Sequence, residues 1–144
     1  MSVVYEQDFH AWLQEQAALL KTGRLHELDV EHLVEEIESM GASERRELLS
    51  RLQVLILHLL KHQYQPARRS KSWLLTTTHQ RTAIGRLLEQ SPSLKRLLTP
   101  AVIQSVYEKA IREALIETDL ERYVFPIDCD YSLAQLLDDD YLPD

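Results

Sequence analysis

The residues best suited to bind a charged group lie together in HLLKHQYQPARRSKSW, residues 58–73. Three cations there stand just before or within the first turn of a predicted helix. The N-terminus of a helix carries partial positive charge from its unpaired N–H groups, so each cation is unfavourable there by about 0.3 to 1 kcal/mol. Cations at a helix N-terminus, where the charge is unfavourable, indicate that another group stabilises them. The candidate anion-binding cluster is Arg68, Arg69, Ser70, Lys71 and Ser72.

Two kinds of group could compensate this cluster. A bound anion such as phosphate could use the helix N-terminus together with the cations, with Tyr64 or Trp73 offering a stacking face. Alternatively, the cations could face glutamates of an earlier helix and hold the protein together. The alternation of acidic and basic segments along the chain favours this second interpretation. Lys61 and Gln65 flank the cluster as secondary candidates.

A metal site is the next candidate, because His58 and His62 are four residues apart and share a helix face. A metal centre in a helical bundle needs further ligands from facing helices. Such a histidine pair arises readily by chance, and no HExxH or CxxC motif accompanies it. We therefore expect no metal and no cofactor, with His58 a hydrogen-bonded core residue and His62 exposed. The secondary carboxylate candidates are Glu35, Glu36 and Glu38.

Catalytic chemistry has no local signature in this chain. There is no GxSxG motif and no glycine loop that could cradle a phosphate. A site assembled from residues distant in sequence would leave no such motif. An enzyme, for example a metal-assisted hydrolase that uses His58 with the glutamates of a facing helix, therefore stays open as an alternative.

Apolar residues recur at helical spacing along the N-terminal half. We expect a first helix over residues 4–21, a second over 29–41 and a third over 43–65. Gly23 would end the first helix and Gly41 the second, and Pro66 would break the third. The third helix is apolar on nearly all sides, so it should be the buried centre of the fold.

The C-terminal half continues the helical pattern. A fourth helix over residues 72–90 contains Gly85, where we expect a neighbouring helix to approach closely. The Ser-Pro pair at 91–92 and the Thr-Pro pair at 99–100 are each typical of a cap followed by the first residue of a helix. Residues 132–135, SLAQ, match a capping box for a last short helix.

These elements predict an all-α protein. We expect one domain, residues 1–144, built as a bundle of about five main helices with a short C-terminal helical turn. Residues 120–144 would form an acidic extension packed on or beside the bundle. With 144 residues the chain can bury a core without a disulfide or a metal, and three glycines and five prolines favour helix.

Charge is segregated along the chain. There are eleven acidic and four basic residues in 1–47, and one acidic and nine basic residues in 48–98. The last segment, 99–144, has eleven acidic and three basic residues. The net charge is −7. Nucleic acid is therefore not the expected partner, although a segregated basic face can attract an anion locally.

The chain also carries few signals of location. No apolar run approaches the roughly 20 residues of a membrane span, and MSVVYEQDF lacks the order of a signal peptide. A lone cysteine, Cys129, cannot form an internal disulfide. We expect a cytoplasmic protein with no membrane partner.

Three long blocks carry a family resemblance: LDVEHLVEEIESMGASERREL, HLLKHQYQPARRSKSW and LAQLLDDDYLPD. With YEQDFHAWLQEQAALL near the start, they resemble the bacterial family catalogued as domain of unknown function 29 over nearly the whole chain. The resemblance implies a small helical bundle and lends no activity, cofactor or partner. His62 stands where it implies an aromatic residue, commonly tryptophan, which weakens a metal site that requires His62.

The leading functional hypothesis is a binding or adaptor module. It would use the corner between the third and fourth helices to engage an anionic group, either a phosphate-bearing ligand or an acidic protein surface. Besides the enzyme, the remaining alternative is a purely structural or oligomerising bundle, in which Arg68 and Arg69 are fully paired with carboxylates and the chain can form homo-oligomers.

Overall fold

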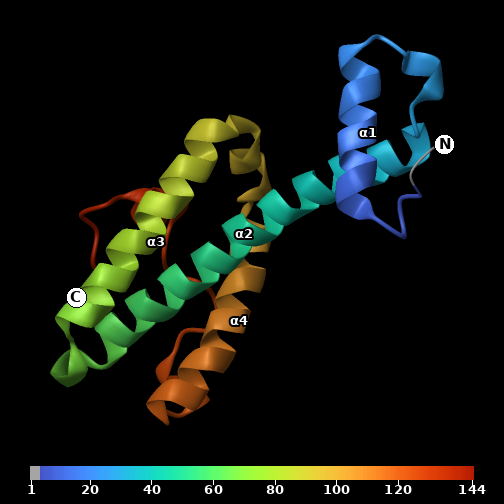
Figure 1. The fold of residues 1–144 in the computed structure, drawn as a ribbon. Helices are drawn as coiled ribbons and strands as arrows, with labels where there is room; N and C mark the ends of the chain where they lie inside the picture. Colours follow the sequence, from blue (N-terminus) through green and yellow to red (C-terminus); the bar gives the residue numbers. More distant parts are fainter. Residues whose placement is uncertain (1–3) are drawn as a thin grey trace. The chain divides into compact units, whose positions relative to one another are not determined.

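The computed structural model describes residues 4–144, and all regular structure in this range is helical (Figure 1). The predicted all-α class is confirmed. No helix among these residues is both long and apolar enough to cross a membrane. The α-helices are α1 Phe9–Lys21, α2 Val30–Tyr64, α3 Lys71–Gln90, α4 Pro100–Thr118 and α5 Leu133–Leu137. Short 3-10 helices are formed by Leu25–Glu27, Pro66–Arg68, Pro92–Leu97 and Arg122–Val124.

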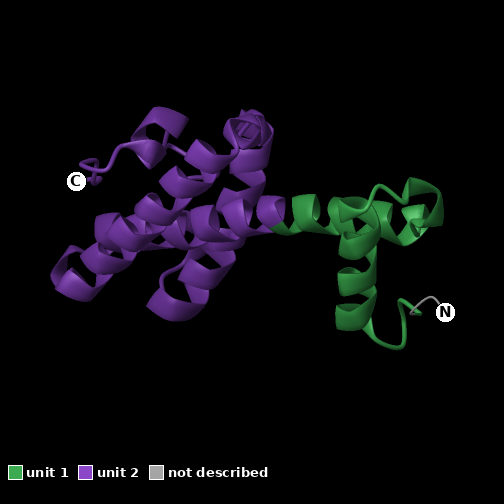
Figure 2. Cartoon of the chain, turned by 45° about the horizontal axis from the view of Figure 1, so that its top comes forward, with its two compact units in different colours: residues 1–43 green, residues 44–144 purple. Residues whose placement is uncertain are grey.

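The chain divides into two compact units, residues 1–43 and 44–144 (Figure 2). The first contains α1 and the N-terminal part of α2. The second contains the rest of α2 and the helices that follow it. A single domain stays a prediction, because compactness alone does not show which parts of a chain unfold together.

α2 runs without a break from Val30 to Tyr64, so the predicted helix end at Gly41 and the new start after it are wrong. A glycine inside a helix costs only about 1 kcal/mol relative to alanine. The strong helix formers that follow, residues 44–48, offset this cost. Glycine ends a helix by adopting a left-handed backbone. Of the glycines in the described residues, Gly23 alone does so, with φ 71° just after α1.

The first unit is organised around Trp12, whose side chain is fully buried. Its indole Nε1–H donates to the Asp29 carboxylate at 3.0 Å, and the Gln16 side-chain oxygen accepts the Asp29 backbone N–H at 2.8 Å. Asp29 also caps α2, because its other carboxylate oxygen accepts the backbone N–H of His32. The Tyr5 ring stacks on His32 with 4.1 Å between ring centroids. Aromatic packing and one carboxylate thus fix the start of α2.

The second unit encloses the main hydrophobic core. The C-terminal part of α2 lies at its centre, as the apolar pattern of that segment predicts, and α3, α4 and the C-terminal segment pack around it. The α2 residues buried there are Leu48, Leu52, Leu55, Ile56, Leu57, Leu59 and Leu60. The other elements contribute, among others, Ile84, Val106, Tyr107, Ile111, Phe125, Tyr131 and Leu136.

Helix caps in the second unit follow the sequence signals. The Thr99 hydroxyl accepts the N–H of Val102 at the start of α4. Ser132 and Gln135 form the predicted capping box of α5. The expected close approach of a neighbouring helix to Gly85 is wrong, since a Cβ placed there would meet no atom within 4 Å.

Candidate functional site

The cation cluster lies at the turn between α2 and α3 (Figure 1). Pro66 has no backbone N–H and restricts the residue before it, so α2 ends at Tyr64 and a 3-10 turn, Pro66–Arg68, follows. We call residues 66–72 the α2–α3 corner. All five members of the predicted cluster lie in it and all five are exposed.

The cations of the α2–α3 corner form no ion pair with a described residue. Among residues 4–144, Arg68, Arg69 and Lys71 have no carboxylate oxygen within 4 Å. Arg69 donates its Nε–H to the His62 backbone carbonyl at 2.7 Å, which holds the base of the guanidinium and leaves its two terminal amino groups free. The interpretation that glutamates of α2 pair with these cations is therefore wrong.

The N-terminus of α3 adds positive potential to the same place. The Ser70 hydroxyl accepts the N–H of Trp73 at 3.2 Å and so acts as the cap. The first-turn amides of Lys71 and Ser72 have no partner within the helix. They present partial positive charge beside the cations.

Behind the corner, the remaining candidates belong to the core or its edge. Lys61 Nζ lies 4.7 Å from the centroid of the Trp73 ring and 3.8 Å from a carboxylate oxygen of Glu117. The Tyr64 ring packs edge-on against Phe125 at 5.1 Å, and burial raises its pKa. Tyr64 is thus engaged in packing, and one face of Trp73 is occupied by Lys61. The secondary candidate Gln65 precedes the 3-10 turn as its N-cap without a side-chain cap bond.

The structure does not bring His58 together with the glutamates. Its Nδ1 lies 2.9 Å from the backbone carbonyl one turn earlier in α2, and burial lowers its pKa. Glu36 accepts the hydroxyl of Tyr5, which raises the pKa of Tyr5 to about 12, while Glu35 and Glu38 are exposed. Because α2 is continuous, Glu36 and Glu38 lie about six turns from His58 on one helix. These glutamates therefore do not face His58 from another helix, as the enzyme alternative requires.

A metal centre finds no support from other clusters either. No three histidine, cysteine, aspartate or glutamate side chains of residues 4–144 come together in a way that could hold a metal ion. The pKa of His62 is lowered, first by burial and second by the positive charge of Arg69.

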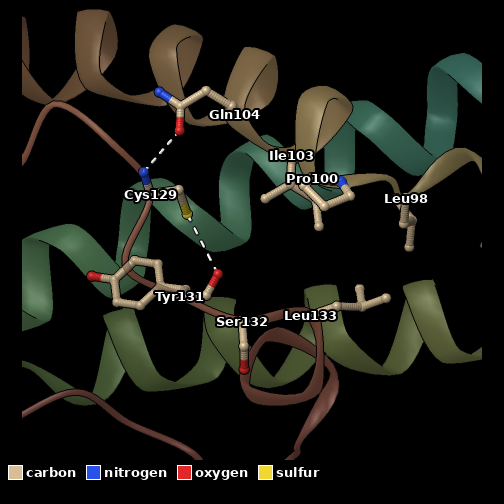
Figure 3. Close-up of a pocket in the computed structure, with 8 residues that line it drawn as sticks. All are labelled: Leu98, Pro100, Ile103, Gln104, Cys129, Tyr131, Ser132 and Leu133. Carbon is tan, nitrogen blue, oxygen red and sulfur yellow. Dashed lines mark hydrogen bonds between the residues drawn. The ribbon is translucent and has the colours of Figure 1, made fainter.

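A pocket that the sequence did not indicate lies between the start of α4 and the C-terminal segment (Figure 3). Its volume is about 480 Å³. Gln104 closes one side, since its oxygen accepts the Cys129 N–H at 2.8 Å and its amide donates to the Ile127 carbonyl at 3.0 Å. The lining residues are Leu98, Pro100, Ile103, Gln104, Cys129, Tyr131, Ser132 and Leu133.

Cys129 and Tyr131 of this pocket already have hydrogen-bond partners within the chain. The Cys129 thiol lies 3.6 Å from the Tyr131 carbonyl, and burial raises its pKa, so the reactive thiolate is scarce. The Tyr131 hydroxyl donates to Gln63 at 2.7 Å. Sequence reasoning missed the pocket because its walls, residues 98–104 and 129–133, are far apart in the chain and carry no shared pattern.

Arg81 is a second feature that sequence reasoning missed. Its side chain is buried, and its three guanidinium nitrogens donate to the backbone carbonyls of Gln135, Leu136 and Tyr141 at 3.0, 3.0 and 2.7 Å. Two of these carbonyls lie in the last turn of α5, and that of Gln135 also accepts the backbone N–H of Asp138 at 3.3 Å. A signal was present, because Arg81 lies at helical spacing from Thr77, Ile84 and Leu87, the other buried residues of α3.

Comparison with known proteins adds a family. The domain of unknown function DUF29 matches residues 4–142, almost the whole chain. No curated protein and no solved structure matched. The match covers α1 to α5 and includes both the α2–α3 corner and the pocket. The chain therefore belongs to the DUF29 family.

Proposed function

We propose that this protein is a binding module whose α2–α3 corner engages an anionic group on a larger molecule. The observation that carries the proposal is the unpaired charge of Arg68, Arg69 and Lys71. The chain contains 23 acidic side chains, yet none in the described residues lies within 4 Å of these three cations.

The chemistry of the corner suits an oxyanion. Guanidinium groups can bind carboxylate or phosphate through two parallel hydrogen bonds, and the free amides at the start of α3 add donors of the same sign. An anion placed there would relieve the unfavourable contact between the cations and the helix N-terminus. Because all these side chains are exposed, they fit a phosphate or an acidic segment carried by a partner better than an enclosed small substrate.

The test is a titration of labelled probes by fluorescence anisotropy. The probes are a polyglutamate peptide, a phosphopeptide and a single-stranded oligonucleotide. We expect at least one of them to bind with an affinity that falls as salt rises. The double variant Arg68→Ala/Arg69→Ala should lose this binding.

A matched control is available in Arg45→Ala/Arg46→Ala. These two arginines are also adjacent, exposed and on a helix, and their removal changes the net charge equally. The control should bind as the wild type does. If both double variants bound the probe equally more weakly than the wild type, the binding would be general attraction between opposite charges. If the wild type showed no salt-sensitive binding, the proposal would be refuted.

A further inference from the structure

The first unit exposes an apolar stripe along the N-terminal part of α2. Val30, Val34, Ile37 and Met40 follow one another at spacings of four, three and three residues and therefore share one side of the helix. Their exposed fractions are 60%, 46%, 67% and 69%. We call these four residues the α2 stripe.

The α2 stripe has the composition of a buried helix face. A single exposed apolar residue is ordinary on a protein surface, but a continuous exposed patch marks a site of interaction. α1 buries Trp12, Gln16 and Leu19 within the unit and leaves the stripe uncovered. The stripe is thus an amphipathic face without a partner in the described chain.

Glutamates line one flank of the α2 stripe. Glu31 and Glu38 are seven residues apart and lie on the same flank, with Glu35 beside them. All three are exposed, and none forms an ion pair with another described residue. α2 carries no lysine or arginine before Arg45, and residues 1–43 hold nine acidic residues against two basic ones.

Together, these features specify the occupant. We infer that the α2 stripe docks a basic amphipathic helix of a partner protein. The apolar side chains of that helix cover the stripe, as in other complexes in which a helix lies on a hydrophobic face. Its lysines or arginines lie against Glu31, Glu35 and Glu38. The same face of a second copy is excluded as occupant by like charge, because both faces would bring the same glutamates.

The experiment uses the full chain and a labelled synthetic peptide of leucine and lysine whose leucines recur at helical spacing. A control peptide of the same composition has strictly alternating leucine and lysine, so it has equal charge but no apolar helix face. We expect the first peptide to bind at least tenfold more tightly than the second in fluorescence anisotropy. Added salt should weaken its binding.

Matched variants separate the α2 stripe from the rest of the surface. Ile37→Glu should weaken peptide binding at least tenfold, and Met40→Glu provides a second variant of the same face. Ile116→Glu changes an isoleucine on α4 that is 79% exposed and should have no effect. Glu38→Lys should weaken binding several-fold, whereas Glu89→Lys, on an exposed site of α3, should not.

Two results would overturn the inference. Equal binding of both peptides, unchanged by Ile37→Glu, would show general attraction to an acidic protein. Self-association in sedimentation that strengthens with salt and disappears in Ile37→Glu would make a second copy the occupant. Arg68→Ala/Arg69→Ala should leave peptide binding unchanged, so the outcome is independent of the proposed function of the α2–α3 corner.

Discussion

Arg81 should be the polar side chain on which the C-terminal segment depends most. We predict that Arg81→Met, which keeps an apolar stem at this position but removes the guanidinium, destabilises the protein by about 4 kcal/mol. The substitution removes three hydrogen bonds from a charged donor. It also leaves the buried carbonyl of Leu136 and the half-buried carbonyls of Gln135 and Tyr141 without that donor.

The magnitude follows from these contacts. A hydrogen bond to a charged group contributes about 1.5 to 3 kcal/mol, and each buried acceptor left without a partner costs about 1 to 3 kcal/mol. The three bonds share one side chain, so their effects do not add fully. Since small domains are stable by about 5 to 15 kcal/mol, the variant should remain folded but with a much reduced margin.

The assay combines two measurements. Urea unfolding followed by circular dichroism gives the free energy of unfolding, and hydrogen exchange of residues 133–141 reports whether the C-terminal segment detaches locally. Arg81→Lys should lie between wild type and Arg81→Met, because an ammonium group can reach only some of the acceptors.

Arg86→Met provides the control, since it changes an exposed arginine of the same helix and should stay within about 0.5 kcal/mol of wild type. A loss below about 1 kcal/mol in Arg81→Met, with unchanged hydrogen exchange at 133–141, would refute the assigned role of Arg81.

Four further substitutions test the backbone and the histidines. Gly85→Ala should raise the free energy of unfolding by about 0.5 to 1 kcal/mol, because the site is helical and open. Gly23→Ala should lower the free energy of unfolding, because φ there is 71°. Urea unfolding measures both changes. Burial lowers the pKa of His58, so the folded state loses stability as pH falls below the unfolded value of about 6.5. His58→Gln should flatten that loss. The Asp29 carboxylate raises the pKa of His32, so its contribution is present below about pH 6.5 and is lost as pH rises through the folded pKa. His32→Gln should change the pH dependence of the free energy of unfolding in the opposite direction to His58→Gln. The measurement is urea unfolding of both variants between about pH 5 and 8. The same pH dependence in the two variants would contradict both pKa shifts.

Much of the local structure could be predicted because its signals are short-range. The Ser-Pro and Thr-Pro pairs at 91–92 and 99–100 mark the start of a 3-10 helix and of α4, and the capping box at 132–135 marks α5. The signals at Thr99 and Ser132 need only a hydroxyl and a few backbone amides that are close in sequence. Ser91 differs, because its hydroxyl forms no cap bond and donates to Glu44. Gly23 is a similar case, since one residue with a left-handed backbone suffices to end a helix.

The misjudged features depend on a balance or on distant residues. Glycine often ends a helix, but the small cost of Gly41 inside α2 is offset by neighbouring residues that favour helix. The sequence pattern does not measure the balance between these two effects. The expected ion pairs between the corner cations and the glutamates rest on the net charge of each segment of the chain. Net charge does not show which side chains lie close together. The Arg81 contacts join residues more than fifty positions apart, where no periodicity connects donor and acceptor.

The burial of Trp12 has a spectroscopic consequence. The chain has two tryptophans, and the division at residue 43 leaves Trp12 in the first unit and Trp73 in the second. A Trp73→Phe variant therefore retains one fluorophore, which reports on the first unit, while circular dichroism of the same variant reports mainly on the larger second unit. Coincident fluorescence and circular dichroism transitions in urea would establish that residues 1–43 and 44–144 unfold as one cooperative domain, and separated transitions would establish two.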